Sequence, residues 1–204
     1  MSLFYSDYLI STSINLGPPF VEGRAMNYQD ILDFWFKETA PELWFVRSDE
    51  LDQNIRERFY AIWQAACAGE LEPWRATIHG RLAEIIVLDQ FSRNLNRDSP
   101  QAFAQDAMAL VLAQEALKQA DFAALTELER NFLLLPYMHS ESAKTHEIAV
   151  PLLKQYTSAN TYDFELKHKV IIDRFGRYPH RNAVLGRTSS AEEIAFLQEP
   201  NSSF

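Results

Sequence analysis

The 204-residue sequence contains little glycine, a single cysteine and no long apolar run. Its six glycines are about half of average usage, which disfavours a turn-rich all-β fold and favours helices joined by short connections. Cys67 alone permits neither an intramolecular disulfide nor a multi-cysteine metal site, so we expect a reducing, cytoplasmic location. Apolar runs such as 85–88 and 132–135 are far shorter than the roughly 20 residues that span a bilayer. We therefore expect no membrane partner.

Positive charge is also scarce. The chain has 19 Lys and Arg against 28 Asp and Glu, a formal net charge of −9, which makes nucleic acid or an anionic membrane an unlikely partner on electrostatic grounds. The deficit is uneven, because residues 164–187 hold six Lys or Arg and only two Asp or Glu. This segment is a basic island in an acidic chain, and it needs a physical reason.

The remaining pattern predicts one all-α domain of about eight helices over residues 26–204, with antiparallel neighbours joined by short connections. Capping residues and steps of three and four between apolar residues indicate where the helices lie. We expect helices to start after Asn27, Ser48, Thr77, Ser99 and Thr126, and then at 141, at Thr161 and after a Ser189–Glu192 capping box. Proline should end the helix that precedes it at Pro136 and kink the helix that contains Pro151.

Residues 1–25 are expected to form a loosely docked or non-native N-terminal arm. They carry no Lys or Arg ahead of a hydrophobic stretch, so they do not match a signal peptide. Met26 directly precedes the first clear helix and is our expected natural start.

Strong catalytic motifs are absent. The sequence has no Gly-rich phosphate loop, no nucleophile elbow, no paired zinc-ligand helix and no clean repeat of about 34 residues. We therefore predict no cofactor and no metal, and candidate site residues must come from weaker signals.

Two polar runs follow apolar helices. Asp89 and Arg93 are four residues apart and can form an ion pair, either as a structural pair at a helix end or inside a cleft. In the second run, His139, Ser140 and Glu141 lie beyond Pro136. Ser140 and Glu141 suit a helix N-terminus, whereas His139 and Glu141 are also the residue types of acid/base chemistry.

The basic island supplies the third run. His168 shares the apolar face of its helix, which is typical of a hydrogen-bonded core histidine. Further on, Gly176 and Pro179 fix the backbone around a set of donors that suit a carboxylate or phosphate: Arg177, His180, Arg181 and Asn182. The alternative is that these arginines pair with the chain's own surplus carboxylates.

Taken together, these runs resemble a bacterial family of domains of unknown function numbered 924. The resemblance rests on LDQFSRN at 88–94, ERNF at 129–132, HSE at 139–141 and RFGRYPHRNAVLGR at 174–187, with support from FWF at 34–36, WF at 44–45 and IRERF at 55–59. It covers about residues 28–198, and Ser92 stands where relatives tend to have proline. It implies a tetratricopeptide-like α-α superhelix and no particular activity, substrate or catalytic residue.

Our leading functional hypothesis is that the polar runs converge on one cleft that binds a small anionic ligand. Its expected ligand-binding residues are Asp89, Arg93, Arg177, Arg181 and Asn182. Any acid/base or hydrolytic chemistry would fall to His139, Glu141 and His180, since histidine titrates near neutrality. Two alternatives stay open: a helical scaffold that binds an acidic peptide or protein in an aromatic groove, or buried networks that only join helices. The sequence does not fix the oligomeric state.

Overall fold

The computed structural model describes residues 20–21, 24–200 and 202. Most of the predicted N-terminal arm therefore lies outside the described residues. Two short strands are described from it, β1 (Phe20–Val21) and β2 (Arg24–Ala25), which pair antiparallel with Phe20 opposite Ala25.

The described chain is a stack of helices, and this confirms the all-α prediction. Its α-helices are α1 (Tyr28–Asp33), α2 (Asp49–Cys67), α3 (Ile78–Ile86), α4 (Ser92–Leu95), α5 (Asp106–Ala116), α6 (Glu127–Met138), α7 (Ala143–Tyr156), α8 (Ala159–Phe175) and α9 (Ala191–Phe196). Two π-helical segments continue α1 and join α3 to α4: η1 (Phe34–Glu38) and η4 (Val87–Phe91). Short 3-10 turns lie at η2 (Pro41–Leu43), η3 (Glu72–Ala76), η5 (Pro100–Ala102), η6 (Phe122–Ala124) and η7 (Pro179–Arg181).

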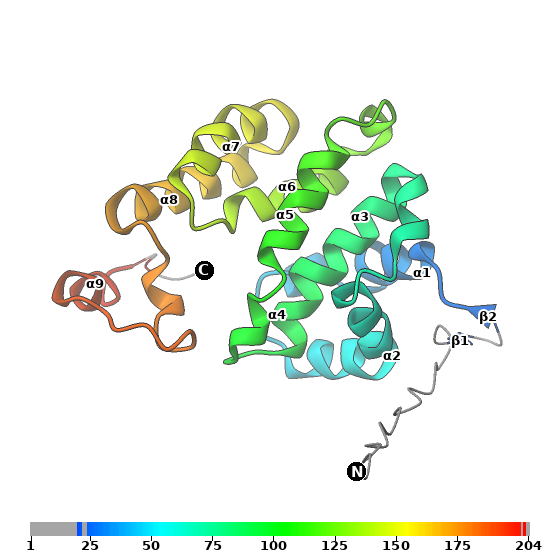
Figure 1. Ribbon diagram of the computed structural model, residues 1–204, viewed down its shortest axis with the longest axis horizontal. Coiled ribbons are helices and arrows are strands. Elements are labelled where there is room, and N and C mark those ends of the chain that lie inside the picture. Colours follow the sequence, from blue (N-terminus) through cyan, green and yellow to red (C-terminus); the bar gives the residue numbers. More distant parts are fainter. Residues whose placement is uncertain (1–19, 22–23, 201, 203–204) are drawn as a thin grey trace, which may run out of the picture.

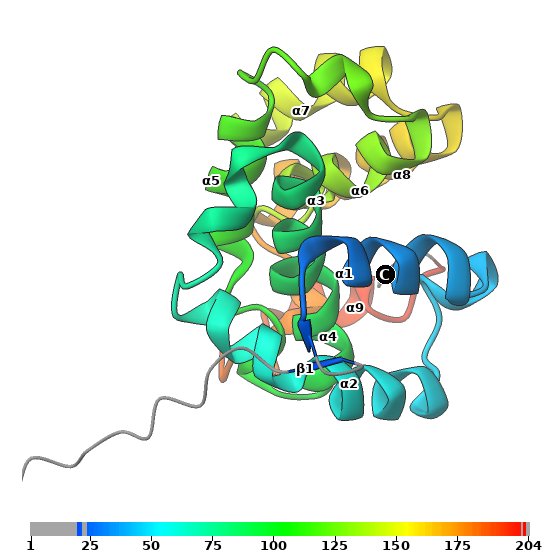
Figure 2. The ribbon, with the colours of Figure 1, turned by 90° about the vertical axis from the view of Figure 1, so that its right-hand side faces the viewer.

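The rod formed by α3, η4 and α4 is the centre of the molecule. It packs against α1 and α2 on one side and against α5 and α6 on another. Figure 1 shows the N-terminal helices, in blue and cyan, and the C-terminal helices, in yellow to red, on opposite sides of this rod and α5. In Figure 2, α7 and α8 lie at the end of the stack farthest from α2. Nearly every residue of the rod is buried, as its apolar sequence predicts.

Local sequence explains most helix starts. Asn27 and Asp30 form a capping box at α1, and the side chains of Ser48 and Thr77 cap α2 and α3 as expected. Gly176 ends α8 in the left-handed region at φ 68°. Thr126 and Glu129 also form the predicted capping box of α6.

Several boundary predictions were wrong. Ser99 and Pro100 open only the 3-10 turn η5, and the α-helix starts later, at Asp106. Pro136 does not end α6, which runs on to Met138, because its ring is buried in the core and the packing of this last turn outweighs one lost hydrogen bond. The last capping box is one residue later than expected, at Ser190 and Glu193.

Helix α8 also begins earlier than predicted, at Ala159, because Ser158 rather than Thr161 is the cap. Helix α7 contains Pro151 as expected, and its cap is Ser142 rather than Ser140 or Glu141. The second polar run is therefore a connection between α6 and α7, and the side chains of His139, Ser140 and Glu141 do not cap α7.

A buried ion pair fastens η3 to the central rod. Glu84 is fully buried, and the guanidinium of Arg75 donates to both of its carboxylate oxygens at 2.6 and 2.7 Å. Close to it, Gly80 is required by a close approach, since a Cβ there would lie 1.9 Å from the carbonyl oxygen of Trp74. The ion pair and the close approach at Gly80 both join the turn η3 to the helix α3.

We expect Arg75→Met to lower the free energy of unfolding by about 3 kcal/mol, because it leaves the Glu84 carboxylate buried without its cation. Chemical denaturation measures this change. The control is Lys118→Met at the exposed Lys118–Glu115 pair, which should cost at most about 1 kcal/mol. If the two variants lost equal amounts of unfolding free energy, the burial of Glu84 would not be what makes its ion pair important.

Candidate functional site

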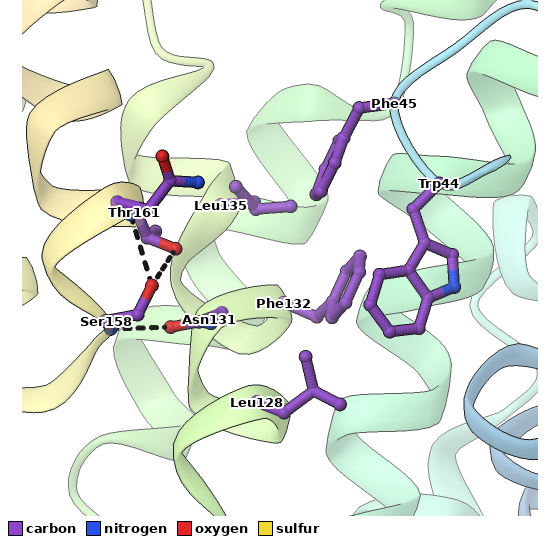
Figure 3. A pocket seen from close by; sticks show the side chains of 9 residues that line it. Trp44, Phe45, Leu128, Asn131, Phe132, Leu135, Ser158 and Thr161 are labelled. Atoms are coloured by element: carbon purple, nitrogen blue, oxygen red, sulfur yellow. Dashed lines mark hydrogen bonds between the residues drawn. The ribbon is translucent and has the colours of Figure 1, made fainter. Parts of the chain in front are cut away.

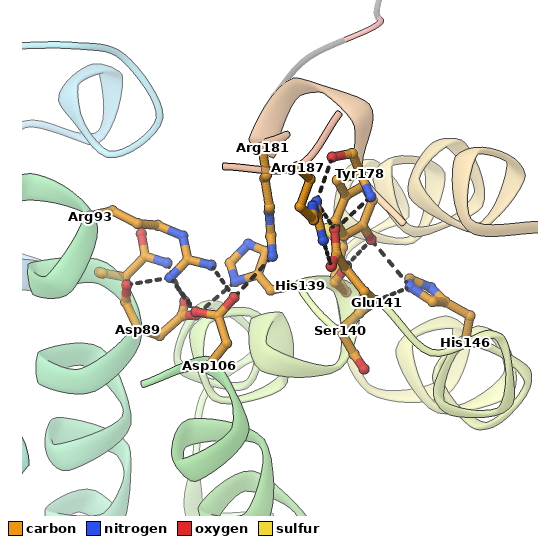
Figure 4. Close-up of polar contacts among 12 residues, drawn as sticks. Asp89, Arg93, Asp106, His139, Ser140, Glu141, His146, Tyr178, Arg181 and Arg187 are labelled. Carbon is orange, nitrogen blue, oxygen red and sulfur yellow. Dashed lines mark hydrogen bonds and ion pairs between the residues drawn. The ribbon is translucent and has the colours of Figure 1, made fainter. Parts of the chain in front are cut away.

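A cleft of about 340 Å³ lies where α5, the α6–α7 connection and η7 meet. It is lined by Pro100, Phe103, Ala104, Asp106, Ala107, Leu110, His139, Ser140, Glu141, Arg181 and Leu185. Residues from all three polar runs thus come together at one place, with Asp89 and Arg93 behind the lining (Figure 4).

Asp89 lies in the π-helical segment η4 and is almost completely buried. Its carboxylate accepts a hydrogen bond from Gln90 at 2.5 Å and lies 3.0 Å from Nη1 of Arg93, which confirms the predicted i, i+4 pair. Burial by itself would raise the pKa of Asp89, but the charge of Arg93 and the contact with His139 outweigh it and hold the pKa well below its usual range. Asp89 is therefore a buried anion at neutral pH.

Asp106, at the start of α5, joins this pair to the opposite wall. Its Oδ2 accepts from Nη2 of Arg93 at 3.2 Å and from Nη1 of Arg181 at 3.1 Å. Its Oδ1 lies 3.1 Å from Nη1 of Arg93, at ion-pair distance but outside hydrogen-bond geometry. One carboxylate thus links two arginines that are far apart in the sequence.

His139 ends α6 and points toward Asp89. Its Nδ1 lies 2.7 Å from Oδ1 of Asp89, so in the neutral ring Nδ1 carries the proton and Nε2 carries a lone pair. Nε2 has no hydrogen-bond partner among the described residues, and His139 lines the cleft. Burial lowers the pKa of His139 below 6.5 even though the Asp89 charge opposes this shift. The ring is therefore a neutral base at pH 7.

Arg181 is held between two aromatic rings. Its guanidinium carbon lies 4.5 Å from the centroid of Phe103 and 4.6 Å from that of Tyr178. Burial lowers the pKa of its guanidinium, opposed by the charge of Asp106, and the arginine remains charged. Its Nε is buried without a hydrogen-bond partner among the described residues. Arg181 is thus a cation whose donors are only partly used by the protein.

Glu141 is occupied by structural contacts. Both of its oxygens accept from Arg187, at 2.5 and 2.9 Å, and the backbone N–H of Tyr178 donates to it at 2.7 Å. Burial raises the pKa of Glu141, but these hydrogen bonds outweigh it and lower the pKa from 4.5. Glu141 is an ionised carboxylate that fastens η7 to the α6–α7 connection.

Besides Asp89 and Arg93, three residues predicted from the sequence do not line the cleft. Arg177 donates to both oxygens of Glu193 at 2.7 and 2.9 Å, beside α9. Asn182 donates to Ser189 and accepts from Arg187. The ring of His180 lies tilted against that of Tyr178, with a ring-centroid distance of 5.6 Å, and its Nδ1 is buried without a partner among the described residues. The structure places Arg177 and Asn182 in contacts that shape the C-terminal segment.

Sequence reasoning missed several members of the network. Asp106 and Arg187 contact residues 75 and 46 positions away, so no local spacing signals them. A buried pair also lies behind the cleft, where Nδ1 of His146 is 2.7 Å from Oε1 of Glu165 and both side chains are fully buried. Within that pair, Oε2 of Glu165 has no hydrogen-bond partner among the described residues. The basic run around residue 187 was the only available signal for Arg187.

The basic island pairs largely with the chain's own carboxylates. Lys169 contacts Asp173, Arg174 contacts Glu192, and Arg177 contacts Glu193. Arg181 and Arg187 are different, because the carboxylates that they contact line the cleft. Self-pairing therefore accounts for all five of these cations, and at Arg181 and Arg187 it also shapes the candidate site.

The family model for bacterial proteins of unknown function, DUF924, matches residues 31–201. The chain belongs to this family. A solved structure, that of a protein of unknown function from Agrobacterium tumefaciens, is 33% identical and superposes with a TM-score of 0.79 over 84% of this chain and 96% of that one. A comparison with curated proteins finds no match. The resemblance seen in the sequence is thus confirmed, and the comparisons add no activity.

The described residues lack two further features. They contain no group of three or more His, Cys, Asp or Glu side chains placed to hold a metal ion. None of their helices combines the length and apolar character that crossing a membrane requires.

Two buried histidines near the cleft make the stability depend on pH. Burial lowers the pKa of His168 to about 3 and that of His180 to about 4, against 6.5 for an exposed ring. Their stabilising contribution is complete above pH 6.5 and is lost as the pH falls toward the folded values, because the unfolded chain binds the protons first. Each histidine should reduce the free energy of unfolding by about 1.4 kcal/mol per pH unit below 6.5.

Denaturation between pH 6.5 and 4.5 measures this slope. His168→Gln keeps a donor for the Phe164 carbonyl but cannot titrate, so its slope should be shallower than that of the parent. His79→Gln, at the half-buried histidine beside Glu129, is the control for the substitution itself. A parent whose stability is flat over this range would show that these histidines are protonated in the folded chain.

Proposed function

We propose that this protein binds a small anionic ligand in the cleft, and that the Asp89–His139 pair exchanges a proton with it. The observation that carries the proposal is the open Nε2 of His139, a neutral base that Asp89 orients at the wall of a cleft also lined by Arg181. A base held in one tautomer by a buried carboxylate is the arrangement of general acid/base sites.

The arginine side of the cleft supports an anion rather than a cation. Glu141 is occupied by Arg187 on both oxygens, and Asp106 is shared by Arg93 and Arg181. Among the groups that line the cleft, unused hydrogen-bonding capacity lies on a donor, Arg181, and on two acceptors, Nε2 of His139 and Oδ1 of Asp106, of which Oδ1 is already at ion-pair distance from Arg93. A ligand with an anionic group for Arg181 and a proton-bearing group or water for His139 satisfies both.

Hydrolysis by an activated water follows from the same arrangement. Nε2 of His139 would take a proton from water as the oxygen attacks an ester carbonyl, the leaving group departs with the bonding electron pair, and Asp89 would stabilise the resulting imidazolium. Ser140 lines the cleft beside His139, but in Figure 4 its hydroxyl is directed away from the Asp89–His139 pair. The proposed nucleophile is therefore water and not a serine.

Binding is tested by thermal shift with inorganic phosphate and a series of small carboxylates. A ligand present at about 100 times its Kd stabilises the parent by about 2.7 kcal/mol, which is roughly 5–10 °C in Tm for a chain of this size. Arg181→Gln should lose the shift. Arg174→Gln is the control, since Arg174 contacts Glu192 away from the cleft. If none of these anions stabilises the parent, the proposed function is wrong.

The proposed ester hydrolysis is tested with the mono-p-nitrophenyl ester of glutaric acid, which carries a carboxylate and a chromogenic leaving group. We expect kcat/KM to rise with pH through a pKa below 6.5 and then stay level, because His139 must be neutral to act as the base. His139→Gln should lower kcat/KM by about 10²- to 10⁴-fold. His79→Gln is the matched control, and equal rates in both variants would remove His139 from the reaction.

A second candidate function is favoured by a separate aromatic groove of about 180 Å³ (Figure 3). It follows α6 from Leu128 to Leu135, and its rim residue Phe45 is 71% exposed while stacking on Phe132. An exposed aromatic of this kind is typical of a peptide-binding surface. Trp44 also lines the groove, so its fluorescence would report a bound acidic peptide, and Phe45→Ser should weaken that binding.

A further inference from the structure

The residues that line the cleft are of two chemical kinds. The polar ones are Asp106, the His139–Glu141 connection and Arg181. The apolar ones, together called the apolar wall, are Pro100, Phe103, Ala104, Ala107, Leu110 and Leu185. A purely ionic ligand such as phosphate would leave the apolar wall in contact with water, whereas a ligand with an apolar portion would cover it.

Two side chains of the apolar wall are small. Ala104, in the turn before α5, and Ala107, in the first turn of α5, are both exposed and both line the cleft. Phe103 and Leu110 flank them, and Leu185 also lines the cleft from the C-terminal segment. The two alanines are thus the small, exposed members of an apolar lining whose other members are larger.

The charges around the cleft favour one negative charge on the ligand. Three arginines, Arg93, Arg181 and Arg187, pair with three carboxylates, Asp89, Asp106 and Glu141. With His139 neutral, these six groups sum to zero, so a dianion would add two charges beside Asp106 and Glu141 with only Arg181 partly available. A monoanion can be accommodated at lower electrostatic cost.

We infer that the ligand of this cleft is a monocarboxylate with a short apolar chain, its carboxylate at Arg181 and its chain on the wall formed by Ala104 and Ala107. This inference rests on the proposed function and specifies its ligand class. The apolar wall makes chain length the property that the cleft selects.

The test is calorimetric titration of the full chain with acetate, butanoate and hexanoate, and with inorganic phosphate and hexanol for comparison. Each added methylene that is buried should lower Kd by about fourfold. Phosphate should bind more weakly than hexanoate, because it carries more charge and covers no apolar surface. Hexanol should also bind more weakly, because it has no anion for Arg181.

Two variants test where the alkyl chain of the ligand lies in the cleft. Ala107→Phe fills the apolar wall at an exposed position and should remove the gain from acetate to hexanoate while acetate still binds. Val111→Phe places the same ring on the same helix, at a residue 54% exposed and outside the cleft, and should retain the gain.

The outcomes separate the inference from the proposed function. Equal Kd values for acetate and hexanoate, tighter binding of phosphate, or a chain-length gain that survives in Ala107→Phe would each overturn the inference and leave anion binding in place. If no anion in the series binds the parent, the proposed function fails, and this inference fails with it.

Discussion

The buried carboxylate of Asp89 constrains this structure more than any other group. An ionised carboxylate in the middle of an apolar rod is costly unless it is paired and hydrogen-bonded, so its partners must be brought to it. Gln90 and Arg93 come from the same rod, and His139 comes from the end of α6. Because Arg93 also needs Asp106, and Asp106 receives Arg181, this one charge connects four separate segments of the chain.

This arrangement explains why the same residues serve both stability and the candidate site. A network of paired charges must be nearly complete to be tolerated inside a protein. Within the network that starts at Asp89, the unused hydrogen-bonding capacity lies on Oδ1 of Asp106, Nε of Arg181 and Nε2 of His139, all on residues that line the cleft. The surrounding contacts, such as Arg187 with Glu141, have no such unused capacity and act as fixed support.

Local signals were sufficient for the fold class and for part of the site. Capping residues and apolar spacing placed α1, α2 and α3, and the i, i+4 spacing predicted the Asp89–Arg93 pair, because these depend on neighbouring residues. The length of α6 depends on the burial of Pro136, which no local rule reports. The contact of Asp106 with Arg181 depends on the tertiary fold in the same way. The tetratricopeptide-like stacking and the single-domain boundary stay predictions.

The π-helical segment η4 has a consequence for how this site can change during evolution. A π turn places one more residue in a turn than an α-helix does, and such segments often occur at functional sites. Deleting one residue between Val87 and Phe91 would remove the extra residue and restore a regular α-helix, with α3 and α4 keeping nearly the same faces. Arg93 would then stay beside Asp106, and the residues of η4 itself, Asp89 among them, would be the ones that shift. The π-helical segment is therefore the place where a one-residue change can move Asp89 relative to His139 while the rest of the rod stays in the core.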